Sequence, residues 1–273
     1  MSSESTPKNP SKYSQMFNLS GKNAAVIGGG GYLGSEFCNC LLESGAQVLL
    51  ADSPHGKGLE VTQRLKKSFS EKIEFIAVDT TDPKSLQALR SRIQTSYSGK
   101  LDILINTAVG VGKDNHFGPF ESYSWEDWRH VMDVNLGGPF LSIQTLLPVL
   151  AKGSSIINIA SMYGVVSANP SIYKDSGWNS PCSYAASKGG LIQLTKYLSV
   201  HLASKGVRVN AISPGGVFND HEPEFVKNYS EKTPMNRMLN RDELMGAIVY
   251  LSSDASSYVT GQNILVDGGW TAW

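Results

Sequence analysis

The segment NAAVIGGGGYLG at residues 23–34 decides how the rest of the chain is interpreted. Its apolar first half predicts a buried strand over 23–29, and an amphipathic stretch that predicts a helix begins at 33. The glycines between them allow a tight turn and leave bare backbone N–H groups at the start of the helix. A strand, a glycine-rich turn and a helix in this order predict the first unit of a parallel sheet with crossover helices.

The same alternation of short apolar runs and longer amphipathic stretches continues to the end of the chain. It predicts strands over 23–29, 46–52, 72–79, 101–108, 154–161, 208–214 and 263–269. It predicts helices over 33–44, 56–69, 83–97, 124–150, 183–204 and 241–253, with Gly45 and Gly206 at helix C-termini. We therefore expect an α/β fold: a single doubly wound Rossmann-type parallel sheet of about seven strands flanked by helices. Residues 1–18 read as a flexible tail, and 19–273 as one domain.

Composition argues against several classes of partner. The 24 basic and 24 acidic residues balance, so the chain lacks the positive field that nucleic acid or an anionic membrane attracts. No apolar run is long enough to span a bilayer, and the polar N-terminal residues do not resemble a signal peptide. Cys38, Cys40 and Cys182 show no metal-ligand spacing and are odd in number, which favours reduced thiols in a cytoplasmic protein without a metal.

The glycine-rich turn predicts a site for a dinucleotide. Its spacing can be read as Gly28, Gly31 and Gly34, placed so that backbone N–H groups and the helix N-terminus meet a pyrophosphate. An ordinary tight connection is the plainer alternative for a glycine-rich turn taken alone.

Two acidic residues at strand ends bear on the choice of nucleotide. Asp52 ends the second predicted strand, where a carboxylate accepts hydrogen bonds from ribose hydroxyls and repels a 2′-phosphate. This favours NAD over NADP, although Lys57 and Arg64 lie nearby in sequence and Asp52 also suits a turn or a helix cap. Asp79, after the third strand, is a candidate near the adenine or, equally, an N-cap.

The segment SYAASKGG at 183–190 suggests proton-transfer chemistry. Tyr184 and Lys188 are four residues apart, so they lie one above the other on a helix face. An ammonium beside a phenol stabilises the phenolate, which would bring the pKa of the tyrosine toward neutral pH and allow it to exchange a proton with a hydroxyl or carbonyl group. A Tyr/Lys pair in isolation is more often a solvated helix face.

Motifs elsewhere in the chain favour the catalytic interpretation of this Tyr/Lys pair over a solvated helix face. The chain contains VDTTD at 78–82, INTA at 105–108, VNLGGPF at 134–140, INIAS at 157–161, YAASK at 184–188, SPGGV at 213–217 and TGQNILVDGG at 260–269. With the glycine-rich turn at 28–34, these segments follow the order found in the short-chain dehydrogenase/reductase family. The chain resembles that family over nearly its whole length, from Leu19 to Gly269.

The resemblance assigns roles to particular residues. It implies that Ser161 binds the reacting oxygen, that Tyr184 is the acid/base, and that Lys188 binds the nicotinamide ribose and lowers the pKa of the tyrosine. Asn135 would be the fourth catalytic residue and help hold a water-linked proton path; otherwise Ser161 caps a turn and Asn135 is a buried structural amide. The expected cofactor-binding residues are Gly28, Gly31, Tyr32, Leu33, Gly34, Asp52, Asp79, Asn106, Ala108, Ile159, Tyr184, Lys188, Pro214, Gly215 and Val217.

The sequence also departs from the family pattern. The usual paired asparagines after the fourth strand read Asn106-Thr107, and Asn219 stands where a threonine often contacts the nicotinamide carboxamide. The glycine spacing is similar to that of the family's extended, sugar-nucleotide-modifying members, whereas the length and the C-terminal half are similar to the shorter members.

The function implied is hydride transfer between a nicotinamide cofactor, NAD rather than NADP, and a small polar secondary alcohol or ketone. Alternatives are an epimerase or dehydratase that uses bound NAD transiently, and a nucleotide-sensing regulator without chemistry. The resemblance and the apolar ending GGWTAW also imply a homo-oligomer, a tetramer or a dimer.

Two segments are candidates for substrate recognition. Residues 162–183 form a longer link between Ser161 and Tyr184 than the family usually has, and 218–238 occupy the place of the family's substrate lid. The first carries the aromatic Tyr163, Tyr173 and Trp178 and the polar Asn169, Lys174, Asp175 and Asn179, while the second carries His221, Lys227 and Arg237. This mixture favours a sugar-derived or polyol substrate, with a surface insertion or subunit contact as the alternative.

Overall fold

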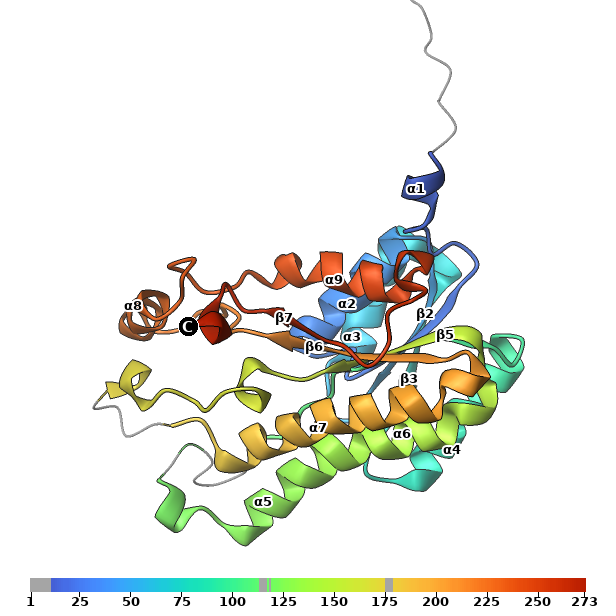
Figure 1. Ribbon diagram of the computed structural model, residues 1–273. Helices are drawn as coiled ribbons and strands as arrows, with labels where there is room; N and C mark the ends of the chain where they lie inside the picture. Colours follow the sequence, from blue (N-terminus) through green and yellow to red (C-terminus); the bar gives the residue numbers. More distant parts are fainter. Residues whose placement is uncertain (1–10, 113–116, 118, 175–178) are drawn as a thin grey trace, which may run out of the picture.

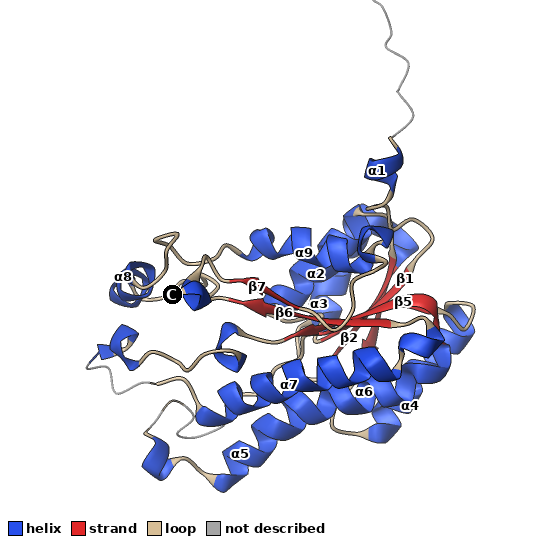
Figure 2. Ribbon diagram, in the orientation of Figure 1, coloured by secondary structure: helices blue, strands red, loops and turns tan. Residues whose placement is uncertain are grey.

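Seven parallel strands form one sheet in the computed structural model, which describes residues 11–112, 117, 119–174 and 179–273. The strand order is β3-β2-β1-β4-β5-β6-β7, and helices cover both faces of the sheet (Figure 1; Figure 2). The predicted doubly wound Rossmann-type sheet is therefore confirmed.

The predicted strands and helices all have counterparts. The strands are β1 (Asn23–Ile27), β2 (Gln47–Asp52), β3 (Ile73–Ala77), β4 (Leu101–Asn106), β5 (Leu150–Ile159), β6 (Arg208–Pro214) and β7 (Asn263–Val266). The helices are α1 (Lys12–Gln15), α2 (Tyr32–Glu43), α3 (Gly58–Phe69), α4 (Pro83–Ser96), α5 (Trp125–Met132), α6 (Gly138–Leu146), α7 (Cys182–His201), α8 (Pro223–Glu231) and α9 (Met245–Ser252). Gly45 and Gly206 adopt positive φ angles after helices, as expected.

Three differences from the predicted elements have local causes. The helix expected over 124–150 is divided, because Asp133–Gly137 form a π-helical turn between α5 and α6. Strand β5 begins at Leu150, earlier than predicted, and its pairing with β4 shifts register between Leu101 and Ile103. Within the expected tail, Lys12–Gln15 form the single helical turn α1; residues 1–10 lie outside the described part.

Helix α8 was not predicted, because what holds it in place is distant in sequence. Its apolar residues Phe225, Val226 and Tyr229 pack in one small cluster with Met162 and Trp270. A nine-residue helix that begins at a proline has little stability of its own, so this tertiary contact is what supports it.

Two apolar layers hold the sheet between its helices. One lies on the side of α2, α3 and α9 and contains Phe37, Leu41 and Ile248; the other lies on the side of α4 and α6 and contains Leu86 and Leu146 (Figure 1). Within the described residues, no helix combines the length and the apolar character that crossing a membrane requires.

The sheet places a crevice between β1 and β4. Strand β1 pairs with β2 on one side and with β4 on the other, so the chain changes direction across the sheet at this point. Such a switch point opens a crevice at the carboxyl ends of the strands. A Cβ atom on Gly28, whose φ is +86°, would lie 2.5 Å from the backbone nitrogen of Ala108. The close approach of these two backbones therefore requires glycine here.

Candidate active site

A cavity of about 420 Å³ lies at this crevice, beside the carboxyl ends of β1, β4, β5 and β6. Most of the residues predicted to form the site line it together: Gly28, Gly31, Tyr32, Leu33, Gly34, Ile159, Ser161, Tyr184, Lys188, Pro214, Gly215 and Val217. The predicted residues that are not part of its lining are Asp52, Asp79, Asn106, Ala108 and Asn135.

Lys188 is the most deeply buried charged group of the cavity. Its side chain is 3% exposed, and its Nζ donates a hydrogen bond of 2.8 Å to the carbonyl oxygen of Ile159. The same Nζ lies 5.7 Å from the ring centre of Tyr184, one turn earlier on α7. Burial lowers the pKa of Lys188 to about 8, so at neutral pH the group still carries most of its charge.

Tyr184 shares a hydrogen bond with Ser161 at the end of β5. Burial raises the pKa of the Tyr184 phenol, and the hydrogen bond with Ser161 partly opposes that rise. The lowering of this pKa by Lys188, expected from the sequence, is therefore not seen; the ammonium group instead binds the Ile159 carbonyl. The geometry nevertheless places a phenol, a hydroxyl and an ammonium group in one cavity.

Asn135 ties the loop after β4 to α7. It is fully buried in the π-helical turn, where its Oδ1 accepts a hydrogen bond of 2.7 Å from the Gly110 backbone N–H. Its Nδ2 donates to Ser187 Oγ at 3.3 Å, and Ser187 directly precedes Lys188. The side chain thus supports the backbone around Lys188 from behind the cavity. π-Helical turns frequently occur at functional sites.

Asn106 joins a buried polar chain rather than the cavity wall. It donates to Asn158 Oδ1 at 2.9 Å and accepts from Ser142 Oγ at 2.8 Å. Asn158 in turn donates to Thr195 Oγ1 at 2.9 Å, so the chain of hydrogen bonds links β4, β5, α6 and α7. The neighbouring Thr107 lines the cavity instead.

Asp52 sits between the glycine-rich turn and the start of α3. Its half-buried carboxylate accepts hydrogen bonds from the backbone N–H groups of Ser53, Gly30 and Gly58. A side chain on Gly30 would collide with the carboxylate, so the close approach of Asp52 requires glycine at this position. Burial raises the pKa of Asp52, and the three hydrogen bonds oppose the rise.

Asp79 is exposed at the end of β3. Its Oδ1 accepts hydrogen bonds from the backbone N–H of Thr81 at 2.8 Å and from the Thr81 hydroxyl at 2.7 Å. The contacts of Asp79 in the structure are thus those of a local turn, and the N-cap of α4, the alternative weighed for Asp79, is Asp82 instead.

The start of α2 fits the diphosphate of a dinucleotide. Its N-cap, Gly31, makes no side-chain cap, so the N–H groups of the first turn are left for a ligand. Tyr32, at the first helical position, donates its hydroxyl to the Phe218 carbonyl at 2.7 Å, and Arg241 lies over its ring at 5.2 Å. The glycine-rich turn is thereby joined to the beginning of segment 218–238.

Of the side chains proposed for substrate recognition between Ser161 and Tyr184, the aromatic ones that the structure describes line the cavity and the polar ones do not. Tyr163 and Tyr173 line it and are hydrogen-bonded to one another. The polar groups bind protein partners instead: Asn169 Oδ1 accepts from Ser171 N–H, Lys174 pairs with Glu224 at 3.1 Å, and Asn179 Oδ1 accepts from Ser180 N–H. Asp175 and Trp178 lie outside the described residues.

Segment 218–238 supplies side chains that the sequence did not single out. Phe225, Tyr229 and Met238 line the cavity together with the expected His221. His221 stacks on Phe225 with ring centres 5.2 Å apart. Of the other expected groups, Arg237 is bound by both carboxylate oxygens of Glu243, and Lys227 is exposed and away from the lining. The repeat of aromatic residues at 225 and 229, one helical turn apart, was the available signal.

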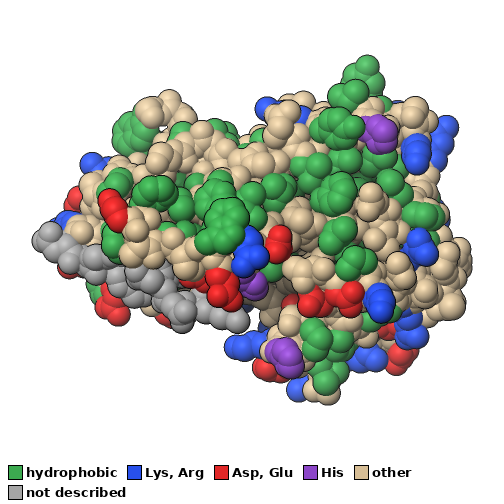
Figure 3. Space-filling view, turned by 90° about the horizontal axis from the view of Figure 1, so that it is seen from below, with side chains coloured by type: hydrophobic (Ala, Val, Ile, Leu, Met, Phe, Trp, Pro, Cys, Tyr) green, Lys and Arg blue, Asp and Glu red, His purple; other side chains and the backbone are tan. Residues whose placement is uncertain are grey.

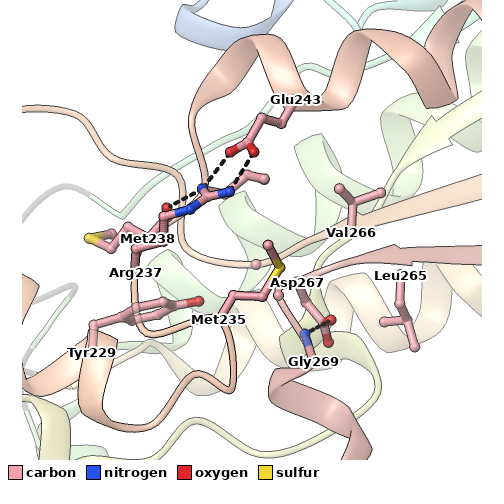
Figure 4. Close-up of a pocket in the computed structure, with 12 residues that line it drawn as sticks. Tyr229, Met235, Arg237, Met238, Glu243, Leu265, Val266, Asp267 and Gly269 are labelled. Carbon is pink, nitrogen blue, oxygen red and sulfur yellow. Dashed lines mark hydrogen bonds and ion pairs between the residues drawn. The ribbon is translucent and has the colours of Figure 1, made fainter.

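A second cavity of about 510 Å³ lies behind the turn that follows β6. Figure 4 shows Tyr229 on one side of it and Asp267 and Gly269, beyond β7, on the other. Gly215, Tyr229 and Met238 line both cavities, so they lie between them.

Comparison with known proteins gives matches over almost the entire chain. Residues 33–271 match the family model described as enoyl-(acyl carrier protein) reductase. The galactitol 2-dehydrogenase (L-tagatose-forming) of Cereibacter sphaeroides is 32% identical, over 96% of this chain and 99% of its own length. The sorbose reductase SOU1 of Candida albicans is 31% identical, over 97% and 92%. A solved short-chain dehydrogenase from Leptospira borgpetersenii with bound NAD+ is 36% identical with a TM-score of 0.81, over 98% of both chains.

The buried charge of Lys188 yields a prediction about stability. Lowering its pKa from 10.5 to about 8 corresponds to roughly 3 kcal/mol lost on burying the ammonium group at neutral pH. Between those two pH values the folded protein has released the proton while the unfolded chain keeps it, so this loss disappears as pH rises. Lys188→Met should therefore unfold in more urea than the wild type at pH 7, and this advantage should shrink at pH 9.5.

The exposed Lys196, two turns later on α7, gives the matched control. Lys196→Met should change the free energy of unfolding by no more than about 0.5 kcal/mol at either pH. An advantage of Lys188→Met that is the same at pH 7 and pH 9.5 would contradict the assignment of a buried charge.

Proposed function

Because the chain belongs to the short-chain dehydrogenase/reductase family, we propose that it oxidises a neutral polyol to a ketose, or catalyses the reverse reduction, with NAD. The observation that carries the proposal is the meeting of Ser161, Tyr184 and Lys188 in one cavity with the glycine-rich turn. When bound there, the nicotinamide supplies or accepts the hydride. The N-terminus of α2 would hold its diphosphate, Lys188 its ribose, and residues 214–217 its nicotinamide end.

The protein's own residues carry the proton chemistry. Ser161 and Tyr184 both reach the same point of the cavity, since they are hydrogen-bonded to one another. In oxidation, Tyr184 takes the hydroxyl proton of the alcohol, and in reduction it returns a proton to the carbonyl oxygen. Ser161 holds that oxygen in place, and the ammonium group of Lys188 lies 5.7 Å from the centre of the Tyr184 ring. Segment 218–238 covers the substrate.

The aromatic wall of the cavity supports a neutral, hydroxylated substrate. Tyr163, Tyr173 and Phe225 offer flat faces to C–H groups, and the tyrosine hydroxyls serve as hydrogen-bonding groups. At the outer mouth, Lys174 is neutralised by Glu224, and Glu222 adds a further negative charge. An anionic substrate such as a sugar phosphate would meet this acidic rim unfavourably. Two of the relatives carry the names of a polyol dehydrogenase and a ketose reductase.

The position of Asp52 supports NAD as the cofactor. Its carboxylate lies at the carboxyl end of β2, beside the glycine-rich turn, where the adenosine ribose of a dinucleotide binds in this fold. A carboxylate there accepts hydrogen bonds from two ribose hydroxyls and repels a phosphate on the 2′ oxygen. The related Leptospira protein was solved with NAD+.

Replacing the phenol should separate chemistry from binding. We expect the wild type to form NADH with galactitol or sorbitol, and Tyr184→Phe to lose at least about 1000-fold in kcat, because its ring has no transferable proton. The affinity for NADH, followed by its fluorescence, should change by less than about twofold. Tyr97→Phe is a matched control, since the Tyr97 hydroxyl reaches the Val48 carbonyl, away from the cavity.

Most of the activity surviving in Tyr184→Phe would overturn the assignment. Net formation of NADH by the wild type would also exclude an epimerase or dehydratase, which returns the hydride, and a regulator, which transfers none.

The cofactor assignment is tested by Asp52→Asn. Asparagine keeps an oxygen that can accept from Gly30 and Gly58, so the turn should stay folded, but it removes the negative charge. We expect the ratio of NAD to NADP in kcat/KM to fall at least about tenfold, equivalent to ~1.4 kcal/mol. Asp79→Asn, on an exposed residue, should leave the ratio unchanged, and an unchanged ratio in Asp52→Asn would contradict the assignment.

We further propose that the chain forms a homo-oligomer through the helices on one side of the sheet. Figure 3 views this side, where hydrophobic side chains gather on the surface, and Trp125, Tyr197 and Val200 on α5 and α7 are each more than 60% exposed. Sedimentation at micromolar concentration should give a dimer or tetramer. Val200→Glu should shift the distribution toward monomer, whereas a monomeric wild type would refute the proposal.

A further inference from the structure

The turn after β6 has almost all of its backbone N–H groups occupied. Gly215 donates to the Val266 carbonyl at 2.9 Å, and Phe218 donates to the Leu239 carbonyl at 2.8 Å. Gly216 donates instead to a side chain, the hydroxyl of Tyr229 on α8. Within the described part of the chain, the Val217 N–H is left without a protein acceptor, and Val217 lines the cavity.

Tyr229 is held firmly in this position. Its side chain is 2% exposed, and its ring stacks on Trp270 with centres 4.6 Å apart. Its hydroxyl accepts from Gly216 and donates to Met162 Sδ at 3.6 Å. Met162 directly follows Ser161, so one hydroxyl group joins α8, the turn after β6 and the segment that carries Ser161.

The two glycines of the turn are what permit this contact. A Cβ atom on Gly216 would lie 2.6 Å from the Tyr229 ring, and one on Gly215 would lie 3.2 Å from its hydroxyl oxygen. Either would displace the ring or the turn. The sequence PGG at 214–216 and the tyrosine at 229 therefore fit each other sterically as well as by hydrogen bonding.

We propose that Tyr229 is a positioning residue for the nicotinamide end of the cofactor: its hydroxyl fixes the turn 214–218 and so directs the free Val217 N–H into the cavity. The inference rests on the proposed function, because it takes the ligand beside this turn to be a nicotinamide nucleotide. The turn therefore takes its correct shape only when α8 is packed in place, because the acceptor for the Gly216 N–H lies on α8. A chain with α8 displaced leaves the Gly216 N–H unpaired and the nicotinamide contact out of place.

The test separates the two halves of the cofactor. Tyr229→Phe keeps the ring and its stacking on Trp270 but removes the acceptor for Gly216. NADH contains the nicotinamide, whereas ADP-ribose lacks it and contacts only the remainder of the site. By calorimetry, the variant should bind NADH about five- to tenfold more weakly than the wild type, the effect of one lost hydrogen bond, and ADP-ribose with unchanged affinity.

A second measurement follows the turn itself. In hydrogen exchange, a peptide spanning 214–218 should exchange faster in Tyr229→Phe than in the wild type, while one spanning β7 should be unchanged. Tyr97→Phe is the matched control: Tyr97 is a buried tyrosine whose hydroxyl reaches the Val48 carbonyl at 3.5 Å, away from the cavity. It should alter neither the affinity ratio nor the exchange of 214–218.

The outcomes are distinct. Equal weakening of NADH and ADP-ribose in Tyr229→Phe, or no weakening of either, would overturn the positioning role while leaving the proposed function intact. A wild-type protein that binds neither nucleotide would overturn the proposed function and this inference with it.

Discussion

The contact between two stretches of bare backbone, at Gly28 and at Ala108, is the constraint on which the site depends. It brings the turn after β1 against the loop after β4 with no side chain between them, at the place where the sheet changes direction. The N-terminus of α2 is thereby set beside the ends of β4, β5 and β6, and a ligand held by that helix also reaches Tyr184 and Lys188. One short-range steric requirement thus positions groups that are more than 150 residues apart in the chain.

The parts that could be predicted from sequence are those governed by local pattern. Buried parallel strands read as continuous apolar runs, which is why all seven were located, and β6 was bounded correctly at both ends. Tyr184, Lys188 and Ser161 were found because their motifs occur in a fixed order, and the structure places them in one cavity. Helix α8 was missed, since its stability comes from a cluster with Met162 and Trp270 that no local pattern reveals.

Side-chain partners were harder to predict than positions. The polar residues of 162–183 were expected to face a substrate, yet Asn169 and Lys174 are bound to neighbouring protein groups. The direction of the Tyr184 pKa shift also depended on burial, which raises this pKa and cannot be predicted from a four-residue spacing. Tyr229 carried no motif, and its role emerges only when the turn after β6 and α8 are seen in contact.

The π-helical turn at 133–137 sets α5 and α6 out of helical phase. An α-helix advances about 100° per residue, and a π-turn accommodates one residue more than the regular path, so the sequence spacing of the buried residues shifts by one position between α5 and α6. Deleting one residue here would let α5 and α6 join into one regular helix, and each would keep its packing. Asn135 would then no longer face Gly110 and Ser187, and its two hydrogen bonds would be lost. The extra residue therefore serves the site rather than the helix, and a related chain that lacks it can share this fold while lacking this support behind the lysine.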